Sequence, residues 1–251
     1  MIAGEKPEDG AGDSTVFGTL AETYDELRPA DANWWELFEL LVREADLVGR
    51  RVLDVGCGTG RVAAALTERG GRAWGVEPSP EMAARAHARG VHVKVARAEQ
   101  LPFKDGWFDR AVLWLVAHLI DRRAAFGELA RVLAPDGRIA VATFDPEHFS
   151  RYYLNQIFPS LERIDRERFP EPHALVDELA AAGFSALLIP LTQRAEIGRE
   201  EALERIRGRF ISTLRLLDDA EYTAGLARAE RELPEHVPYE LHWAIAVASR
   251  P

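Results

Sequence analysis

The stretch Val52-Leu53-Asp54-Val55-Gly56-Cys57-Gly58-Thr59-Gly60 predicts the fold of the chain around it. A short buried strand runs directly into three glycines at alternate positions, and a helix is expected from Arg61 onward. Because glycine has no Cβ atom, Gly56 and Gly58 allow a sharp turn and a close approach to a ligand. The free N–H groups at the start of the next helix attract negative groups. This strand–turn–helix pattern indicates a site for a nucleotide-like cofactor.

A second stretch, Gly75-Val76-Glu77-Pro78-Ser79, ends the next predicted strand with a carboxylate about 20 residues after the glycine turn. There Glu77 can accept hydrogen bonds from both ribose hydroxyls, and the alternative is an ordinary acidic residue before a helix. At the end of the first strand, Asp54 can face a cationic amino group of a ligand. Its alternative role is to tie down its own turn.

Strand and helix signals alternate along the rest of the chain. The predicted strands cover residues 51–55, 72–76, 91–95, 109–115, 138–143, 184–190 and 239–247. The predicted helices cover 60–69, 80–89, 122–133, an interval at 146–182, and two helices between 199 and 232. This rhythm predicts an α/β fold with a doubly wound, Rossmann-like and largely parallel sheet.

The chain is expected to form a single domain over residues 1–251. Residues 1–14 are predicted to be a loose tail, and residues 15–48 an N-terminal helical segment with a helix capped near Asp31 or Asn33. Residues 193–236 are predicted to be a helical cap inserted before the last strand. We expect this cap to cover the carboxyl ends of the strands, where doubly wound sheets bind ligands.

The composition excludes several kinds of protein. The 251 residues are 47% hydrophobic, enough for one well-filled core. The net charge of −10 disfavours a nucleic-acid partner, and the seven histidines lack metal-ligand spacing, so no metal is expected. Cys57 is the only cysteine, which suits a reducing cytoplasm, and no run approaches the roughly 20 apolar residues of a membrane span. The oligomeric state stays open.

The ribose-binding features alone do not separate S-adenosylmethionine (SAM) from NAD, because both ligands contain ribose and adenine. NAD folds usually carry G-x-G-x-x-G. Here the glycines alternate, Arg61 occupies the place of the third glycine, and the Tyr-x-x-x-Lys spacing of a hydride-transfer site is absent. These observations favour SAM. An NAD-type oxidoreductase and a non-catalytic SAM-binding scaffold remain as alternatives.

From about Tyr24 to Thr143 the sequence closely resembles the class I SAM-dependent methyltransferases of the small-molecule type 11, or UbiE-like, group. The segments that carry the resemblance are YDELRP at 24–29, VLDVGCGTG at 52–60, GVEPS at 75–79, AEQLPF at 98–103, WFD at 107–109 and RVLAPDG at 131–137. The resemblance implies a seven-stranded sheet of order 3-2-1-4-5-7-6 with an antiparallel last strand. It also implies SAM as cofactor, S-adenosylhomocysteine as product and a small-molecule acceptor.

The motifs and the resemblance together predict the residues of the cofactor site. Glu77 would hold the ribose, while Ala98 and Glu99 would flank the adenine. Many relatives carry Asp where this chain has Arg97, so a hydrogen bond to the adenine amino group is not expected from that side chain. The predicted cofactor-binding residues are Asp54, Gly56, Cys57, Gly58, Glu77, Pro78, Ser79, Met82, Ala98, Glu99 and Leu115.

The reaction requires few catalytic groups, because the cofactor brings an activated methyl and the protein mainly orients the acceptor and excludes water. His118 is the candidate general base for an O-, C- or N-methylation, with a packing residue as the alternative. Tyr24 is the second candidate catalytic residue, because the resemblance places it at the methionine end of the cofactor, in reach of the carboxylate or the reacting methyl; its alternative role is an anchor for the N-terminal helix. Residues 209–213 either face the acceptor or pack as a helix. The identity of the acceptor stays open.

Overall fold

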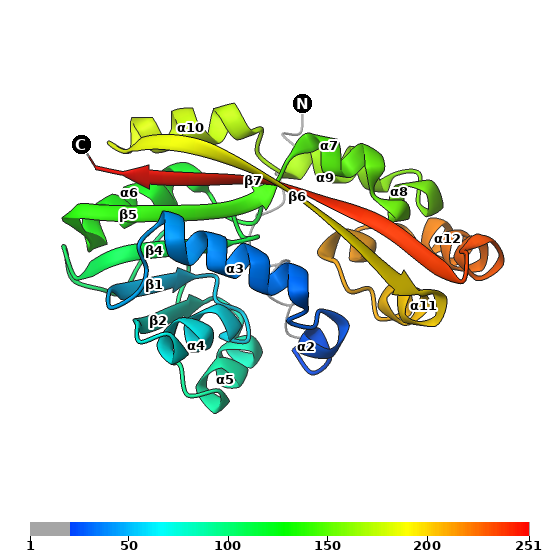
Figure 1. The fold of residues 1–251 in the computed structure, drawn as a ribbon, viewed down its shortest axis with the longest axis horizontal. Coiled ribbons are helices and arrows are strands. Elements are labelled where there is room, and N and C mark those ends of the chain that lie inside the picture. Colours follow the sequence, from blue (N-terminus) through cyan, green and yellow to red (C-terminus); the bar gives the residue numbers. More distant parts are fainter. Residues whose placement is uncertain (1–20, 251) are drawn as a thin grey trace, which may run out of the picture.

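The computed structural model describes residues 21–250, so the predicted tail at 1–14 lies outside the described residues, as do residues 15–20. Seven strands form one sheet in the order β3-β2-β1-β4-β5-β7-β6 (Figure 1). The strands are β1 (Arg51–Val55), β2 (Arg72–Glu77), β3 (His92–Val95), β4 (Phe108–Trp114), β5 (Leu133–Phe144), β6 (Ser185–Gly198) and β7 (His236–Ser249). Only β7 runs antiparallel to its neighbours. The predicted fold class and strand order are confirmed.

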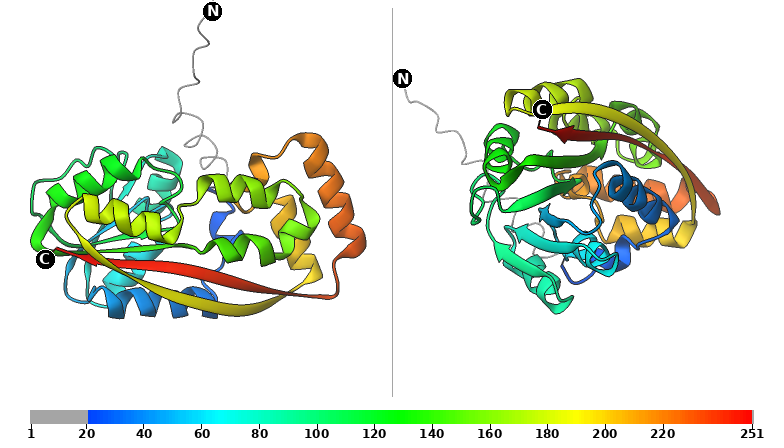
Figure 2. Two further views of the ribbon diagram at one scale, coloured as in Figure 1. Left: turned by 90° about the horizontal axis from the view of Figure 1, so that it is seen from above. Right: turned by 60° about the vertical axis from the view of Figure 1, so that its left-hand side comes forward.

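Helices cover both faces of the sheet, and each face has its own hydrophobic core (Figure 2). Side chains alternate along each strand, so Val52 and Val112 belong to one core while Leu53 and Leu113 belong to the other. The helices of the first core are α3 (Ala32–Glu44), α4 (Arg61–Glu68) and α5 (Pro80–Ala88), and those of the second are α6 (Arg122–Val132) and α10 (Pro172–Ala181). The side chain of Asp31 accepts a hydrogen bond from the Trp34 N–H at 2.9 Å and caps α3, as predicted.

Strands β6 and β7 form an arm that extends beyond the sheet. They pair over 14 residues each, from Ser185 opposite Ser249 to Gly198 opposite His236. Strand β5 pairs with β7 only as far as Trp243, so the outer half of the hairpin leaves the sheet and reaches the cap (Figure 2). The predicted strands were too short, and residues 193–198 belong to the arm instead of the cap. Polar side chains in this outer half hide the alternating pattern of a strand.

The cap contains more of the chain than the predicted 193–236. Helices α7 (Pro146–Arg151), α8 (Tyr153–Ile157) and α9 (Leu161–Arg168) join α11 (Arg199–Arg207), the short 3-10 helix η1 (Ser212–Arg215) and α12 (Asp219–Glu232) at the end of the arm (Figure 1). They enclose a third core that includes Leu154, Phe158, Leu203 and Leu214. The parallel strands point their carboxyl ends at this cap. None of the helices within residues 21–250 combines the length and the hydrophobicity that a membrane span requires.

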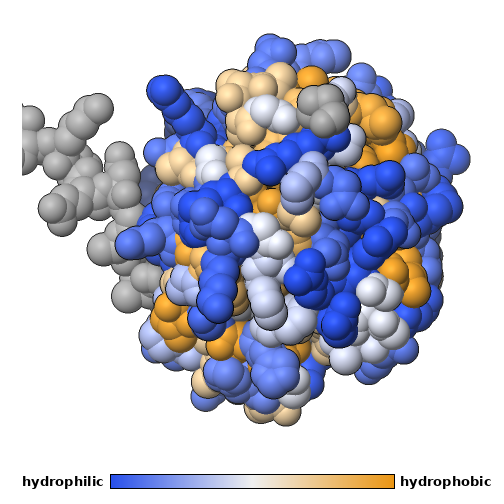
Figure 3. Space-filling view, turned by 90° about the vertical axis from the view of Figure 1, so that its left-hand side faces the viewer, coloured by the Kyte–Doolittle hydropathy of each residue, from blue (hydrophilic) through white to orange (hydrophobic). Residues whose placement is uncertain are grey.

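The opposite end of the molecule, where the parallel strands begin, shows mostly hydrophilic side chains with small hydrophobic patches between them (Figure 3). Its polar character contrasts with the cap end, where the sheet, the N-terminal segment and the cap enclose apolar side chains. Helix α2 (Tyr24–Leu27) belongs to the cap end and contributes Leu27 to the packing of the third core. The candidate functional site therefore lies in the space between the strand ends and the cap.

Candidate active site

A cavity of about 1000 Å³ lies between the carboxyl ends of the strands and the cap. Doubly wound sheets bind ligands at this edge, and small-molecule sites have volumes of this order. One half of the lining comes from the ends of β1, β2 and β4 and the loops after them. The other half comes from the N-terminal segment, the arm and the cap. Of the predicted site residues, all but Ser79 line this cavity.

The glycine turn presents its backbone to the cavity. Gly58 has a φ of +54°, a conformation that strains other residues, and apart from its two chain neighbours no described residue has an atom within 4 Å of the place where its Cβ would stand. Gly56 has a φ of +67°, and a Cβ there would lie 2.5 Å from Cγ2 of Val116. Gly56 therefore permits close packing within the protein, whereas Gly58 leaves room that a ligand can fill.

Glu77 is fixed from two sides at the end of β2. Its Oε2 accepts a hydrogen bond from the Gly58 N–H at 3.0 Å, and its Oε1 accepts one from the Ser79 N–H at 2.9 Å. Each carboxylate oxygen has a second lone pair that can accept a ribose hydroxyl. Burial raises the pKa of Glu77, while the two backbone N–H groups oppose that rise. The residue predicted as the ribose ligand is thus held rigidly at the glycine turn.

Asp54 is the second buried carboxylate of the cofactor half. It accepts a hydrogen bond from the Ala63 N–H at 3.1 Å, so it fastens the start of α4 as the alternative interpretation expected. Burial raises the pKa of Asp54 to about 7, and the charge of Glu77 adds to the rise. Among residues 21–250, neither acid forms an ion pair with a cationic side chain. Two carboxylates without a cationic side-chain partner suit a ligand with positive charges, such as SAM with its sulfonium and ammonium groups.

Two predicted residues use their side chains to fix the elements around the cavity. Ser79 is fully buried, and its hydroxyl accepts a hydrogen bond from the Met82 N–H at 3.3 Å, capping α5. The prediction that Ser79 lines the cofactor site is therefore corrected, although Met82 does line it. The side chain of Cys57 packs on Gly75, where an added Cβ would lie 2.5 Å from Sγ. Burial raises the pKa of this thiol and so disfavours the thiolate form that a nucleophile needs.

The residues predicted to flank the adenine, Ala98 and Glu99, follow the end of β3 and line the cavity. Oε1 of Glu99 accepts a hydrogen bond from the Asp121 N–H at 2.9 Å, and Oε2 lies 3.2 Å from Nε of Arg97. Arg97 thus forms an ion pair with Glu99 at the edge of the cavity. Leu115 follows β4 with a φ of +53°, which is unusual for a branched residue and turns the chain at the cavity floor.

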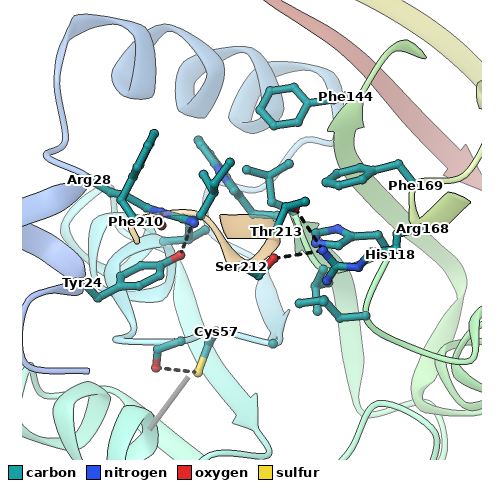
Figure 4. A pocket seen from close by; sticks show the side chains of 18 of the residues that line it. Tyr24, Arg28, Cys57, His118, Phe144, Arg168, Phe169, Phe210, Ser212 and Thr213 are labelled. Atoms are coloured by element: carbon teal, nitrogen blue, oxygen red, sulfur yellow. Dashed lines mark hydrogen bonds between the residues drawn. The ribbon is translucent and has the colours of Figure 1, made fainter. Parts of the chain in front are cut away.

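The N-terminal segment closes one side of the cavity through Tyr24 and Arg28. Arg28 donates a hydrogen bond from Nη1 to the Tyr24 hydroxyl at 3.1 Å and one from Nε to the Phe210 carbonyl at 2.7 Å (Figure 4). Its guanidinium lies over the Tyr24 ring, 4.8 Å from the ring centre. The predicted Tyr24 therefore lines the site together with Arg28, which the sequence interpretation did not single out.

Asp25 fastens this segment to the glycine turn. Its carboxylate accepts hydrogen bonds from the Thr59 hydroxyl at 2.9 Å and from the guanidinium groups of Arg61 and Arg89. The only sequence feature that points to this contact is the arginine at position 61, where an NAD-type motif would have glycine. The ion pair explains that departure, since Arg61 reaches back across the turn to the N-terminal segment.

His118 lies in the acceptor half of the cavity. Its ring stacks on Phe169 with centres 3.9 Å apart, and its buried Nδ1 has no hydrogen-bond partner among the described residues. Burial holds the pKa of His118 well below its usual value, and the nearby charges of Arg168 and Arg28 lower it further. The imidazole is therefore neutral near pH 7. It can take a proton from a bound acceptor only through a ring nitrogen that faces that acceptor.

The cap supplies an aromatic and basic wall that sequence reasoning missed. Residues 210–213 line the cavity, which favours the acceptor-facing interpretation of that segment over simple helix packing. The helical interval at 146–182 was predicted without a role, yet its first part contributes side chains to the same wall. The lining residues from β5, the cap and the arm include Phe144, His148, Phe149, Tyr152, Arg168, Phe169, Phe210, Tyr239 and Trp243.

Comparison with known proteins agrees with this geometry. Residues 53–141 match the family described as "Methyltransferase domain". A demethylmenaquinone methyltransferase of Thermus thermophilus is 34% identical over 204 residues, covering 68% of this chain and 91% of that protein. A malonyl-[acyl-carrier protein] O-methyltransferase of Herminiimonas arsenicoxydans is 36% identical over 173 residues, 62% of either chain.

Solved structures show the same architecture. A putative methyltransferase from an antibiotic biosynthesis pathway of Anabaena variabilis superposes with a TM-score of 0.70 at 21% identity, covering 86% of this chain and 97% of that one. The relatives also decide between the alternatives for the cofactor, because they are transferases of methyl groups and not oxidoreductases. The chain is a SAM-dependent enzyme and belongs to the class I methyltransferases of the UbiE-like group.

Proposed function

We propose that this enzyme methylates a small acceptor that contains a planar ring and binds beneath the cap. The observation that carries the proposal is the continuity of one cavity, which joins the glycine turn to a chamber walled by Phe144, Phe149, Phe169 and Trp243. Aromatic side chains favour flat ligands, which they contact by stacked or edge-on packing. The demethylmenaquinone methyltransferase relative acts on a ring compound by its name, which supports the same class of acceptor here.

In this proposal the residues of the cofactor half bind and orient SAM. Glu77 holds the ribose, the backbone at Gly58 lies against the cofactor, and Ala98 and Glu99 flank the adenine. Tyr24 and Arg28 cover the methionine end, where the guanidinium can bind a carboxylate. When bound, SAM supplies an activated methyl group on a sulfonium, so the protein needs chiefly to align the acceptor with it.

The acceptor half excludes water and handles any proton that the acceptor releases. The cap and the arm cover the chamber, and its aromatic wall leaves few groups that compete for the methyl. His118 is the candidate to accept a proton at Nδ1, because that atom has no partner within the described protein and its ring is neutral near pH 7. A carbon or nitrogen acceptor that needs no base would leave His118 a packing partner of Phe169.

Calorimetric titration with SAM, S-adenosylhomocysteine and NAD tests the cofactor assignment. We expect SAM and S-adenosylhomocysteine to bind and NAD to give no signal. Glu77→Ala removes a charged acceptor of hydrogen bonds, so it should weaken SAM binding by about tenfold or more. The exposed Glu68→Ala on α4 is the matched control and should bind as the native protein does.

Transfer of a labelled methyl group tests the acceptor class. Reduced 1,4-naphthoquinone offers a bare ring, and decanoate offers a chain without one. Labelled product from the naphthoquinol alone would support a planar acceptor. Product from decanoate alone, or SAM binding without transfer to any ring compound, would contradict the proposal.

A further inference from the structure

Arg168 lies at the end of α9 and faces the acceptor half of the cavity (Figure 4). This residue bears on the acceptor class, so the inference drawn from it rests on the proposed function. The side chain is half-buried and donates hydrogen bonds from Nη1 to the Ser212 hydroxyl at 3.3 Å and to the Thr213 hydroxyl at 3.1 Å. These bonds use one nitrogen of the three and hold the guanidinium beside the cap segment 210–213.

Three arginines near the site differ from Arg168 in having carboxylate partners, whereas Arg28 forms hydrogen bonds only with a carbonyl and a hydroxyl. Arg61 pairs with Asp25, Arg122 with Glu178 and Arg205 with Glu201, at 2.5 to 2.6 Å. Within residues 21–250, Arg168 has no carboxylate at ion-pair distance. A guanidinium withdrawn from water without a counter-charge is costly unless an anion joins it.

Asp165 lines the same cavity, and its carboxylate already has a partner. Its Oδ1 accepts the hydroxyl hydrogen of Thr213 at 2.5 Å, and it stands one helical turn before Arg168. Burial raises the pKa of Asp165 to about 6, an effect larger than the opposing charge of Arg168. Asp165 therefore orients Thr213, and within residues 21–250 it forms no ion pair with Arg168.

We propose that Arg168 and Ser212 form an oxyanion subsite and that the acceptor is a planar ring that carries a carboxylate or a comparable oxyanion. The free N–H groups of Arg168 and the hydroxyl hydrogen of Ser212 are donors that an oxyanion can accept from. Phe169 follows Arg168 in the chain and stacks on His118. The oxyanion of one ligand can therefore contact Arg168 while its ring contacts Phe169. Arg28 approaches segment 210–213 from the opposite side (Figure 4).

Paired probes test the subsite without knowledge of the natural acceptor. 2-Naphthoate and 2-naphthamide share a flat ring system and differ in charge, so their dissociation constants are measured by NMR titration on protein saturated with S-adenosylhomocysteine. We expect naphthoate to bind about tenfold more tightly than naphthamide. Arg168→Gln should remove that preference, and Arg168→Lys should retain part of it because the charge remains.

Arg166→Gln is the matched control, because Arg166 lies on the same helix and pairs with Glu162 at the surface. This variant should keep the full preference for naphthoate. Equal binding of the two probes, no binding of naphthoate, or a preference that survives Arg168→Gln would each overturn the subsite. Weaker binding of S-adenosylhomocysteine to Arg168→Gln would assign the guanidinium to the cofactor carboxylate and also overturn it.

The same titrations separate this inference from the proposed function. If S-adenosylhomocysteine binds to the native protein and naphthoate shows no preference, only the oxyanion subsite fails. If S-adenosylhomocysteine does not bind, the proposed function fails before the subsite is reached. Thermal unfolding of each variant shows whether a lost preference reflects the side chain or a loss of the fold.

Discussion

The two halves of the cavity are built in different ways. The cofactor half comes from short pieces of chain at the ends of neighbouring strands, and its central charges are the carboxylates Asp54 and Glu77. The acceptor half comes from residues far apart in the sequence, and its central charge is the guanidinium group of Arg168. The difference suggests that the backbone determines the first half, whereas packing between distant helices determines the second.

Matched glycine substitutions provide the strongest test of this division. Gly225 of α12 faces Phe158, and a Cβ at Gly225 would lie 2.2 Å from Cε1 of that fully buried ring. Gly225→Ala should therefore separate α12 from α8 and destabilise the cap by about 1–3 kcal/mol, more than the gain from better helix propensity. Hydrogen exchange should rise in the two helices, while SAM affinity stays within about twofold.

Gly75→Ala supplies the comparison in the cofactor half. Its Cβ would meet Sγ of Cys57 at 2.5 Å, which pushes on the glycine turn and not on the cap. SAM binding should weaken by about tenfold, with hydrogen exchange in α8 and α12 unchanged. If both alanine variants weakened SAM binding equally, the two halves would form one cooperative unit and the division would be wrong.

The same division explains how much of the molecule could be predicted from its sequence. Glu77, Gly56 and Gly58 stand at fixed spacings because a strand, a turn and a helix place them locally, and the strand order followed from the resemblance. The resemblance predicts Ser79 in the cavity wall, whereas its hydroxyl caps α5. A spacing identifies a turn, but it does not show to which side each side chain points.

The acceptor half was only partly predictable because its contacts are distant in sequence. Arg168 and Ser212 are 44 residues apart, and Arg28 and Phe210 are 182 apart. Helical patterns at 146–182 and 199–232 predicted the elements but not their packing. The outer half of the β6–β7 arm carries polar residues such as Gln193, whose amide donates a hydrogen bond to the Asn33 carbonyl at 2.8 Å. Polar residues at such inward positions interrupt the alternation of apolar and polar residues by which a strand is predicted.

The buried carboxylate of Asp54 in the cofactor half predicts that SAM affinity depends on pH, an effect of intermediate size. Burial raises the pKa of Asp54 to about 7, so folding favours its protonated form. The folded protein binds more protons than the unfolded chain between about pH 4 and pH 7, and this group's contribution to stability falls as the pH rises through that window. A ligand with a positive charge favours the ionised form and binds more tightly above pH 7.

We therefore expect SAM affinity to rise by about tenfold from pH 6 to pH 8. Asp54→Asn should flatten that profile, because the amide does not ionise. Calorimetric titrations at pH 6, 7 and 8 measure the effect. A native profile that is flat, or a slope that Asp54→Asn retains, would show that Asp54 only fastens the start of α4 through the Ala63 N–H.

The smallest effect is expected at His118, in the acceptor half. Its pKa lies well below the usual 6.5 because burial and neighbouring guanidinium groups disfavour the imidazolium. The unfolded chain therefore takes up a proton first as the pH falls below about 6.5, and the folded state loses stability by at most about 1.4 kcal/mol per pH unit. Between pH 7 and pH 8 the ring is neutral in both states, so no change in stability is expected.

Urea unfolding from pH 5 to pH 8 isolates this contribution. The difference in unfolding free energy between native protein and His118→Gln should change only below about pH 6.5, where the native protein loses stability. His87→Gln, an exposed position on α5, controls for the substitution itself. A difference constant over the whole range would mean that His118 takes up its proton in the folded protein. The acceptor half would then carry a titrating cation beside Arg168, and its charge contrast with the cofactor half would depend on pH.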